Sequence, residues 1–226
     1  MSLKLPIRKL LKRDLVWLAE HYCRHRHTYL SHYACFLAEK PDTAPMKENV
    51  GVIDIETTGL KANYSHMLCW CVKEQGKKKI HQDLITRKEV RDKNDKRLVK
   101  SVVAEMVKYD RLVGHYSIRF DIPYIRSRAL YYGIPFPEYR DIYHTDTYYM
   151  ARANLAIHSN RLQAICDYFE IPAKHHPMTP RLWRDAGAGN EKALKTVLMH
   201  CREDVESTDR VYELLLDHVA FTKRSI

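Results

Sequence analysis

Residues 50–60 read VGVIDIETTGL, an apolar run that carries two acidic side chains and ends in a turn. The valines and isoleucines predict a buried β-strand. Because side chains alternate along a strand, Asp54 and Glu56 share one face of it. Two like charges on a buried strand are costly unless cations neutralise them. The stretch therefore predicts either a cation site at the end of the strand or, alternatively, one carboxylate that caps the turn and one that is solvated.

The composition indicates a nucleic-acid-binding protein. The chain has 226 residues and a formal net charge of +10, with a pI near 9.3. A strongly basic chain favours a polyanionic partner, most simply nucleic acid. No apolar run approaches the length of a membrane span, and charge interrupts the amino terminus too early for a secretory signal. We expect an intracellular, cytoplasmic protein without a membrane partner, with a nucleoid or nuclear location left open and no protein partner indicated.

The order of the expected elements predicts an α/β fold with a mixed sheet flanked by helices. A helix is expected at 7–22, and two prolines within 40–48 suggest a linker, so we place a domain boundary between residues 46 and 47. The proline-rich stretch 171–187 is expected to be a loop. In the larger domain, 47–226, we expect strands at 50–56, 67–72, 79–85, 111–115 and 142–147, and helices at 95–109, 121–132, 161–169 and 190–222.

Two further acidic positions turn the first pair into a candidate catalytic site. Asp121, in GHYSIRFDIPYI, lies where a strand gives way to a helix, and Asp204, in HCREDV, lies on the last helix. His200 precedes Asp204 by one helical turn, so both occupy the same face. Four carboxylates from three elements require divalent cations, and oxygen ligands select magnesium or manganese. Two such ions about 4 Å apart can hold the attacking and leaving oxygens of a phosphoryl transfer.

These segments resemble the DEDD superfamily of 3′–5′ exonucleases on the ribonuclease-H-like fold, which includes polymerase proofreading domains and ribonuclease T. DIETTGL is similar to the first motif of that superfamily, GHYSIRFDIPYI to the second and HCREDV to the third. The segment YHTDTYYMARA is similar to the strand between the second and third motifs. The resemblance covers residues 49–218 and implies a ribonuclease-H-like fold.

The resemblance also implies roles for the site residues. Asp54 would contact both metal ions, Glu56 and Asp204 would help hold the ion that activates water, and Asp121 would lie beside the second ion. His200 would orient or deprotonate the attacking water. Its spacing from the aspartate is that of the tyrosine branch, yet the residue is histidine, which leaves its role less secure than those of the carboxylates.

Substrate contacts are expected next to the metals. The turn formed by Thr57, Thr58 and Gly59 can offer backbone N–H groups to the terminal nucleotide. His115 either contacts substrate or has a structural role at the strand end. Together these residues predict a metal-dependent 3′–5′ exonuclease that acts on single-stranded DNA or RNA with two Mg²⁺ or Mn²⁺ ions. An endonuclease or resolvase on the same fold, or a non-catalytic nucleic-acid-binding module, is the alternative.

The segment HYCRHRHTYLSHYACF, residues 21–36, is dense in histidine and cysteine. Two thiolates and two imidazoles within 13 residues are enough for a tetrahedral zinc site, here formed by Cys23, His27, His32 and Cys35. His25 is the alternative third ligand. A metal would suit the amino-terminal domain, 1–46, which has little core of its own. A basic nucleic-acid contact through Arg24 and Arg26, or a merely packed helix and loop, are the other interpretations.

Overall fold

The computed structural model describes residues 12–39, 48–172, 176 and 178–218. The chain divides into two compact units, Met1–Glu48 and Asn49–Ile226. The domain boundary expected between residues 46 and 47 lies outside the described residues. In the first unit, the short helices α1 (Lys12–Glu20) and α2 (Tyr33–Glu39) flank the segment rich in histidine and cysteine.

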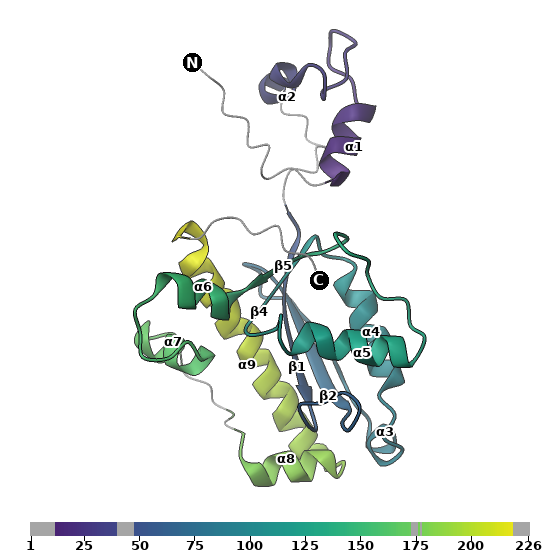
Figure 1. The fold of residues 1–226 in the computed structure, drawn as a ribbon, viewed down its shortest axis with the longest axis vertical. Coiled ribbons are helices and arrows are strands. Elements are labelled where there is room, and N and C mark those ends of the chain that lie inside the picture. The colour runs from purple at the N-terminus through teal and green to yellow at the C-terminus, as the bar shows by residue number, and fades with distance from the viewer. Residues whose placement is uncertain (1–11, 40–47, 173–175, 177, 219–226) are drawn as a thin grey trace. The chain divides into compact units, whose positions relative to one another are not determined.

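The second unit is built on a mixed five-stranded sheet with the order β3-β2-β1-β4-β5 (Figure 1). β1 pairs antiparallel with β2, which pairs antiparallel with β3, whereas β4 is parallel to both β1 and β5. The strands are β1 (Val50–Thr57), β2 (Met67–Glu74), β3 (Ile80–Leu84), β4 (Arg111–Gly114) and β5 (Tyr143–Asp146). This arrangement agrees with the mixed α/β sheet predicted from the sequence.

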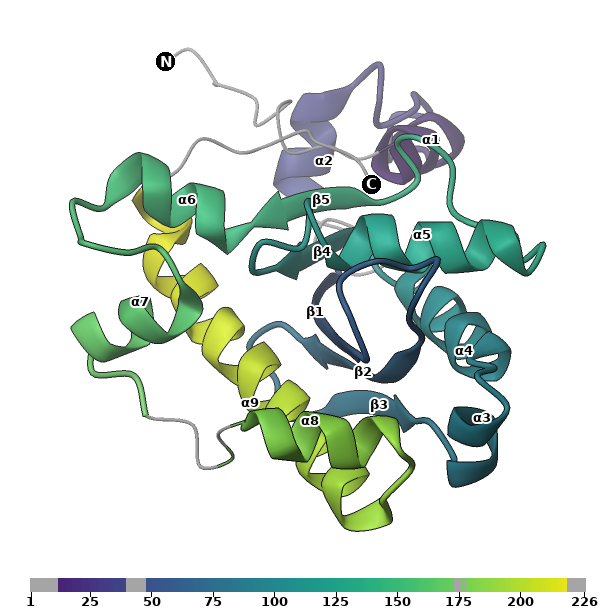
Figure 2. The same ribbon diagram turned by 60° about the horizontal axis from the view of Figure 1, so that its bottom comes forward.

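Helices cover both faces of this sheet (Figure 2). α4 packs on β2 and β3 and on α5, while α9 packs on β1, β2 and β4 and is itself contacted by α6, α7 and α8. The helices are α3 (Arg87–Arg91), α4 (Lys96–Met106), α5 (Asp121–Tyr131), α6 (Thr147–Asn154), α7 (Leu162–Tyr168), α8 (Pro180–Gly187) and α9 (Glu191–Leu215), and α9 is followed by a 3₁₀ turn at Leu216–His218.

The central strands are apolar on both faces because both faces are covered. In β2, every residue from Met67 to Lys73 is buried. In β1, Val52, Ile53 and Ile55 are almost completely buried, so the strand contributes side chains to both layers of the core. A strand buried on both faces reads as a continuous apolar run rather than an alternating one. The carboxylates of β1 interrupt such a run.

The loop expected at 171–187 is wrong in its last part, where the chain forms α8. Thr179 caps this helix, since its Oγ1 accepts a hydrogen bond from the backbone N of Leu182 at 3.2 Å. Pro180 occupies the first turn, where a missing N–H costs nothing. Pro180, one of the prolines that suggested a loop, therefore marks the start of a helix.

Two other helices were not expected. Asp146 begins α6 by accepting a hydrogen bond from the backbone N of Tyr148 at 3.0 Å. Thr86 begins α3 with a capping box to Glu89. The last helix ends at Leu215 and is followed by the 3₁₀ turn, whereas the sequence predicted a helix to residue 222. Residues 219–222 lie outside the described part of the chain.

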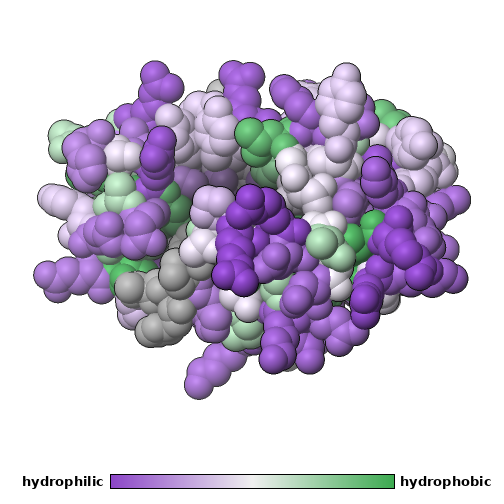
Figure 3. All heavy atoms as spheres, turned by 90° about the horizontal axis from the view of Figure 1, so that it is seen from below, coloured by the Kyte–Doolittle hydropathy of each residue, from purple (hydrophilic) through white to green (hydrophobic). Residues whose placement is uncertain are grey.

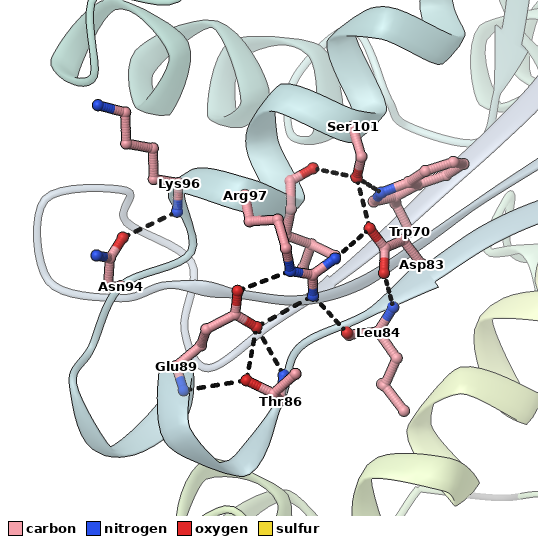
Figure 4. A network of polar contacts seen from close by, with 10 residues as sticks. Trp70, Asp83, Leu84, Thr86, Glu89, Asn94, Lys96, Arg97 and Ser101 are labelled. Atoms are coloured by element: carbon pink, nitrogen blue, oxygen red, sulfur yellow. Dashed lines mark hydrogen bonds and ion pairs between the residues drawn. The ribbon is translucent and has the colours of Figure 1, made fainter.

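A polar network fastens the end of β3 to α3 and α4 (Figure 4). The Arg97 guanidinium donates to Asp83 Oδ2 at 2.6 Å and to Glu89 Oε1 at 2.7 Å. Ser101 also donates to Asp83 Oδ2, and its hydroxyl accepts from the Trp70 indole N–H. Arg97 lowers the pKa of Glu89 to about 2. Glu89 thus stabilises the folded chain at pH values above the ordinary carboxyl pKa, and this contribution is lost as the pH falls toward 2.

None of the helices in the described ranges is both long and apolar enough to cross a membrane. Figure 3 shows one face of the molecule on which hydrophilic residues predominate and hydrophobic residues form small patches.

Candidate active site

The acidic residues of three elements meet near the carboxyl end of β1. Glu56 on β1 and the pair His200 and Asp204 on α9 each offer one ligand atom, and these three atoms lie within 4.8 Å of one another. His200 Nε2 lies 3.9 Å from Glu56 Oε1 and 3.8 Å from Asp204 Oδ2. The structure thus brings together three of the residues that the sequence grouped.

α9 packs closely against β1 near Asp54. Cys201 is buried, and its thiol donates to the backbone O of Asp54 at 3.4 Å. His200 and Asp204, four residues apart, flank this contact on one side of the helix. The small cysteine therefore lets the helix approach closely enough for its polar side chains to reach those of the strand.

Asp121 is held by the backbone of β1. Parallel pairing between β1 and β4 ends at Val52 and Val113, and Asp121 begins α5 a few residues after β4. The backbone N–H of Ile55 lies beyond that pairing and donates to Asp121 Oδ1 at 3.0 Å. The hydrogen bond replaces a missing sheet partner and places the Asp121 carboxylate between the positions of Asp54 and Glu56 along the strand.

Burial and mutual repulsion raise the pKa values of these carboxyl groups. The pKa of Asp54 is raised well above its ordinary value, first by burial and then by the negative charges of Asp204, Glu56 and Asp121. Burial raises the pKa of Asp121 to about 7, although the hydrogen bond from Ile55 opposes the shift. The ionised site is therefore costly to assemble without positive charge.

The donor set fits a hard divalent cation. Asp54 Oδ2 is cut off from solvent, and among the described residues it has no hydrogen-bond partner. A buried carboxylate oxygen without a partner is expensive unless a cation satisfies it. Carboxylate oxygens suit hard cations such as Mg²⁺ or Mn²⁺ better than softer metals. The residues present thus fit a divalent cation.

The tautomer of His200 is set by the segment before α8. His200 Nδ1 lies 2.8 Å from the backbone O of His176, and a carbonyl oxygen only accepts, so Nδ1 carries the proton. In the neutral ring Nε2 then keeps its lone pair, and this nitrogen faces Glu56 and Asp204. The geometry suits a group that receives a proton.

His176 is itself fixed by Glu203. The backbone N of His176 donates to Glu203 Oε2 at 3.2 Å, and its ring Nδ1 lies 2.7 Å from Glu203 Oε1. Glu203 and Asp204 are neighbours on α9, yet Glu203 binds His176 while Asp204 faces the candidate site. Sequence reasoning missed both supporting roles, because no spacing links residue 176 to residue 200.

The turn after β1 is braced by the chain that leads into β2. Thr57 Oγ1 donates to the backbone O of Gly59 at 2.8 Å, and the Ser65 hydroxyl donates to the same oxygen at 3.0 Å. The backbone N of Thr58 donates to the backbone O of His66 at 3.0 Å. In this conformation the Thr58 N–H is therefore already engaged, and the expected N–H contact to a nucleotide is left to Thr57 and Gly59.

His115 occupies the end of β4. Its Nδ1 lies 2.9 Å from Thr147 Oγ1, which donates in turn to the backbone O of Gly114 at 3.2 Å. Asp146 fastens the same loop by accepting from the backbone N of Tyr116 and of Ile118. These contacts favour the structural role for His115 over a direct substrate contact.

Similarity to known proteins agrees with this arrangement. The profile RNase_H_2, which describes the RNase H superfamily, matches residues 52–216. The chain belongs to the RNase H superfamily. This RNase H superfamily domain also contains all five residues of the candidate active site, and it agrees with the resemblance to the DEDD branch drawn from the motifs.

A solved structure shares the fold. The RNase H superfamily domain resembles the family B DNA polymerase from the hyperthermophilic archaeon Pyrobaculum calidifontis, with a TM-score of 0.60 and 20% sequence identity. The similarity covers 78% of this chain and 25% of the polymerase chain, so this chain spans about a quarter of that protein's length. At this identity the likeness establishes the fold. A search of curated proteins by sequence gave no match.

Membership confirms the predicted ribonuclease-H-like α/β fold. It supports a nuclease in general terms, and with it a nucleic-acid substrate and divalent metal ions. The first unit of the chain lies outside the matched range. There the structure gathers Cys23, His25, His32 and Cys35, so His25, the alternative to His27, is the histidine that joins the group.

The metal-free RNase H superfamily domain is expected to lose stability as the pH rises from about 4 to about 7. The folded chain keeps a proton on Asp121, whose pKa is raised from 3.8 to about 7, after the unfolded chain has released it. Stability from this group is therefore present at low pH and is lost as the pH rises. Urea unfolding with a chelator at pH 5 and pH 8 measures the effect.

The matched variant is Asp121→Asn, which keeps an oxygen acceptor for Ile55 and cannot titrate. It should unfold with a smaller pH dependence than the parent chain. Equal pH dependence in the two proteins would contradict the raised pKa of Asp121.

Proposed function

We propose that this chain is a metal-dependent 3′–5′ exonuclease that hydrolyses the terminal phosphodiester of single-stranded DNA or RNA and releases nucleoside 5′-monophosphates. The observation that carries the proposal is the convergence of Glu56, His200 and Asp204 from β1 and α9, in a chain whose motifs follow the DEDD order. Asp54 and Asp121 complete the acidic set through their mutual charge interactions.

Asp54, Glu56, Asp121 and Asp204 would hold two Mg²⁺ or Mn²⁺ ions. Bound there, the ions would neutralise the carboxylates and stabilise charge on the attacking and leaving oxygens. The protein's own contribution is to fix the ligands in advance. Asp121 is set by the Ile55 N–H, and Asp204 by the packing of α9 on β1. Groups that need no rearrangement during the reaction stabilise its charges most effectively.

His200 would accept the proton of the attacking water at Nε2. Its Nδ1 proton is directed to the backbone O of His176, which orients the ring toward Glu56 and Asp204. A tyrosine, the residue of the branch whose spacing this chain has, would offer a hydroxyl in place of a basic nitrogen. Histidine at this position therefore supplies a stronger base to the same place.

A cluster of three tyrosines favours a single-stranded substrate. Tyr116 follows β4, and Tyr148 and Tyr149 follow β5, so all three lie at the sheet edge where parallel β1 also ends. Their rings lie 5.0–6.5 Å apart, and Arg119 Nε donates to the Tyr149 hydroxyl at 3.1 Å. Tyr116 is exposed and the other two rings are half-buried. Accessible tyrosine rings beside an arginine can stack unpaired bases without regard to sequence.

The decisive experiment is a time course on 5′-labelled single strands of DNA and of RNA with Mg²⁺, Mn²⁺ or a chelator. A ladder of products that shorten one nucleotide at a time from the 3′ end, only with metal, is the expected result. Cleavage of a covalently closed circular single strand would replace the proposal with an endonuclease. Salt-sensitive binding without cleavage would replace it with a binding module.

His200→Ala is expected to lower kcat by about 10²–10⁴-fold, the usual contribution of a positioned proton acceptor. The measurement is the single-turnover rate at saturating Mn²⁺, so that weaker metal binding does not contribute. Glu203→Gln serves as the matched variant, because it weakens the hold on His176 and leaves the His200 imidazole in place. Its loss of activity should be measurable but smaller than that of His200→Ala. A His200→Ala rate equal to that of the parent would exclude His200 from the reaction.

A further inference from the structure

The first unit has a very small apolar core. Within residues 12–39 the buried core consists of Leu18, Cys23, Tyr29, Cys35 and Phe36. Two of these five side chains are cysteines, and both are free thiols. A unit of this size rarely buries enough apolar surface to fold by itself, so a further source of stability is expected.

The polar side chains at this core form a compact four-atom cluster. Cys23 Sγ lies 3.9 Å from His25 Nδ1 and 3.5 Å from His32 Nδ1. Cys35 Sγ lies 3.2 Å from His25 Nδ1 and 3.5 Å from His32 Nδ1. All four ligand atoms lie within 4.8 Å of one another. Each sulfur is thus close to both nitrogens.

These separations are those of a metal coordination tetrahedron. Zn–S bonds of about 2.3 Å and Zn–N bonds of about 2.05 Å at tetrahedral angles place sulfur and nitrogen about 3.6 Å apart. The four observed sulfur–nitrogen distances, 3.2–3.9 Å, lie on both sides of that value. A zinc ion would therefore fit with side-chain shifts of a few tenths of an ångström.

The backbone brings the ligands in from two short structures. Cys23 and His25 lie in a tight hairpin, in which the backbone N of Cys23 donates to the O of His27 and the N of Arg26 to the O of Cys23. Arg26 adopts a positive φ of 63° to close this turn, a conformation that costs a non-glycine residue about 1–2 kcal/mol. His32 and Cys35 lie at the start of α2. A strained turn persists where other interactions fix it.

We propose that Cys23, His25, His32 and Cys35 bind one Zn²⁺ in a closed tetrahedral site, and that this ion holds the first unit in its folded form. Two thiolates with two imidazoles select zinc over magnesium or manganese, so this site and the carboxylate site would take different metals. Four protein ligands leave no open position for catalysis, which assigns the site a structural role.

His27 provides the internal comparison. It lies two residues after His25, and its Nδ1 is 3.4 Å from His32 Nδ1, yet it does not belong to the four-atom group. Its ring packs edge-on against that of His32. His25 and His27 are both exposed, so replacing either removes little buried surface. A difference between the two variants would therefore report metal ligation.

The test uses the full chain, purified without chelator, and measures bound zinc by elemental analysis and by titration with a chromophoric chelator. The parent and His27→Ala should each hold one equivalent of zinc. His25→Ala should bind zinc about 10²-fold more weakly, since one of four ligands supplies roughly a quarter of the binding free energy. Replacement with Co²⁺ should give the thiolate-to-cobalt charge-transfer band of a tetrahedral site in the parent and in His27→Ala.

Either of two results would overturn the proposal. One is a parent chain that takes up neither zinc nor cobalt. The other is a reversed pattern, in which His27→Ala loses the metal and His25→Ala keeps it. Because the readouts are metal content and cobalt spectra, they do not depend on nuclease activity.

Discussion

Replacing Asp54 by asparagine is expected to abolish metal-dependent cleavage and, in the same protein, to raise the stability of the metal-free chain. Asp54 stands at the centre of the acidic group, since burial and the charges of Asp204, Glu56 and Asp121 all raise its pKa. Loss of a ligand to both proposed ions removes several kcal/mol of charge stabilisation, which corresponds to a rate lower by roughly 10³-fold or more.

The gain in stability follows from the same charges. Asparagine keeps the shape of the side chain and removes its negative charge. That charge is unfavourable in the folded chain because the group is buried and lies near three other carboxylates. At pH 8 with a chelator, each kcal/mol relieved would raise Tm by about 2–4 °C. Addition of Mn²⁺ should then stabilise the parent more than Asp54→Asn, because the variant has lost a ligand. Calorimetry with and without Mn²⁺ measures both effects.

Glu206→Gln is the control for Asp54→Asn. This residue is an exposed carboxylate on α9, two positions after Asp204, and it should change neither cleavage nor Tm appreciably. An Asp54→Asn protein that cleaves at the parent rate would remove Asp54 from the proposed metal site. An unchanged Tm in chelator would contradict the electrostatic cost assigned to Asp54.

The largest expected loss of stability comes from Asp95→Ala, at about 3–5 kcal/mol, or a fall in Tm of roughly 6–20 °C. Asp95 is completely buried at the start of α4. Its Oδ2 accepts from the backbone N of Met67 at 2.7 Å, its Oδ1 accepts from the Tyr132 hydroxyl at 2.8 Å, and both oxygens bind the Arg128 guanidinium. Removing the carboxylate would leave a buried cation and a buried N–H without their partner.

A double-mutant cycle separates these contributions. In Asp95→Asn with Arg128→Met, the amide oxygen can still accept from Met67, and the buried charges are gone together. Replacing both members of a buried pair usually costs much less than breaking it. We expect a coupling of more than 1 kcal/mol between the two positions, measured by urea unfolding. A cost below about 1 kcal/mol for Asp95→Ala would contradict the role of the pair as an anchor for α5.

Much of the fold and of the site could be predicted because the decisive signals are local. The apolar run around Ile53 and Ile55 identified the central strand, and period two placed Asp54 and Glu56 together. Spacing of one helical turn placed His200 beside Asp204, as α9 now has them. These patterns depend on backbone geometry within a few residues, so the spacing of residues in the sequence is enough to predict them.

The remainder depends on contacts between distant residues. Nothing in the sequence ties His176 to His200 or Glu203 to the loop before α8, because these contacts exist only after α9 has packed on the sheet. The choice between His25 and His27 likewise depends on which way each ring points from one tight turn. Proline was ambiguous for a different reason, since Pro180 is as suitable for the first turn of a helix as for a loop.

The hydrogen bond from His200 to the backbone O of His176 spans 24 positions of sequence and involves no side chain of the partner residue. The ring of His176 adds a second link to α9, because its Nδ1 lies 2.7 Å from Glu203 Oε1. The position of that carbonyl is therefore fixed from α9 itself, since Glu203 also accepts from the backbone N of His176. Under the proposed mechanism, a change at Glu203 would thus alter the reaction rate while the five proposed site residues stayed the same, so that rate could be adjusted separately from the chemistry.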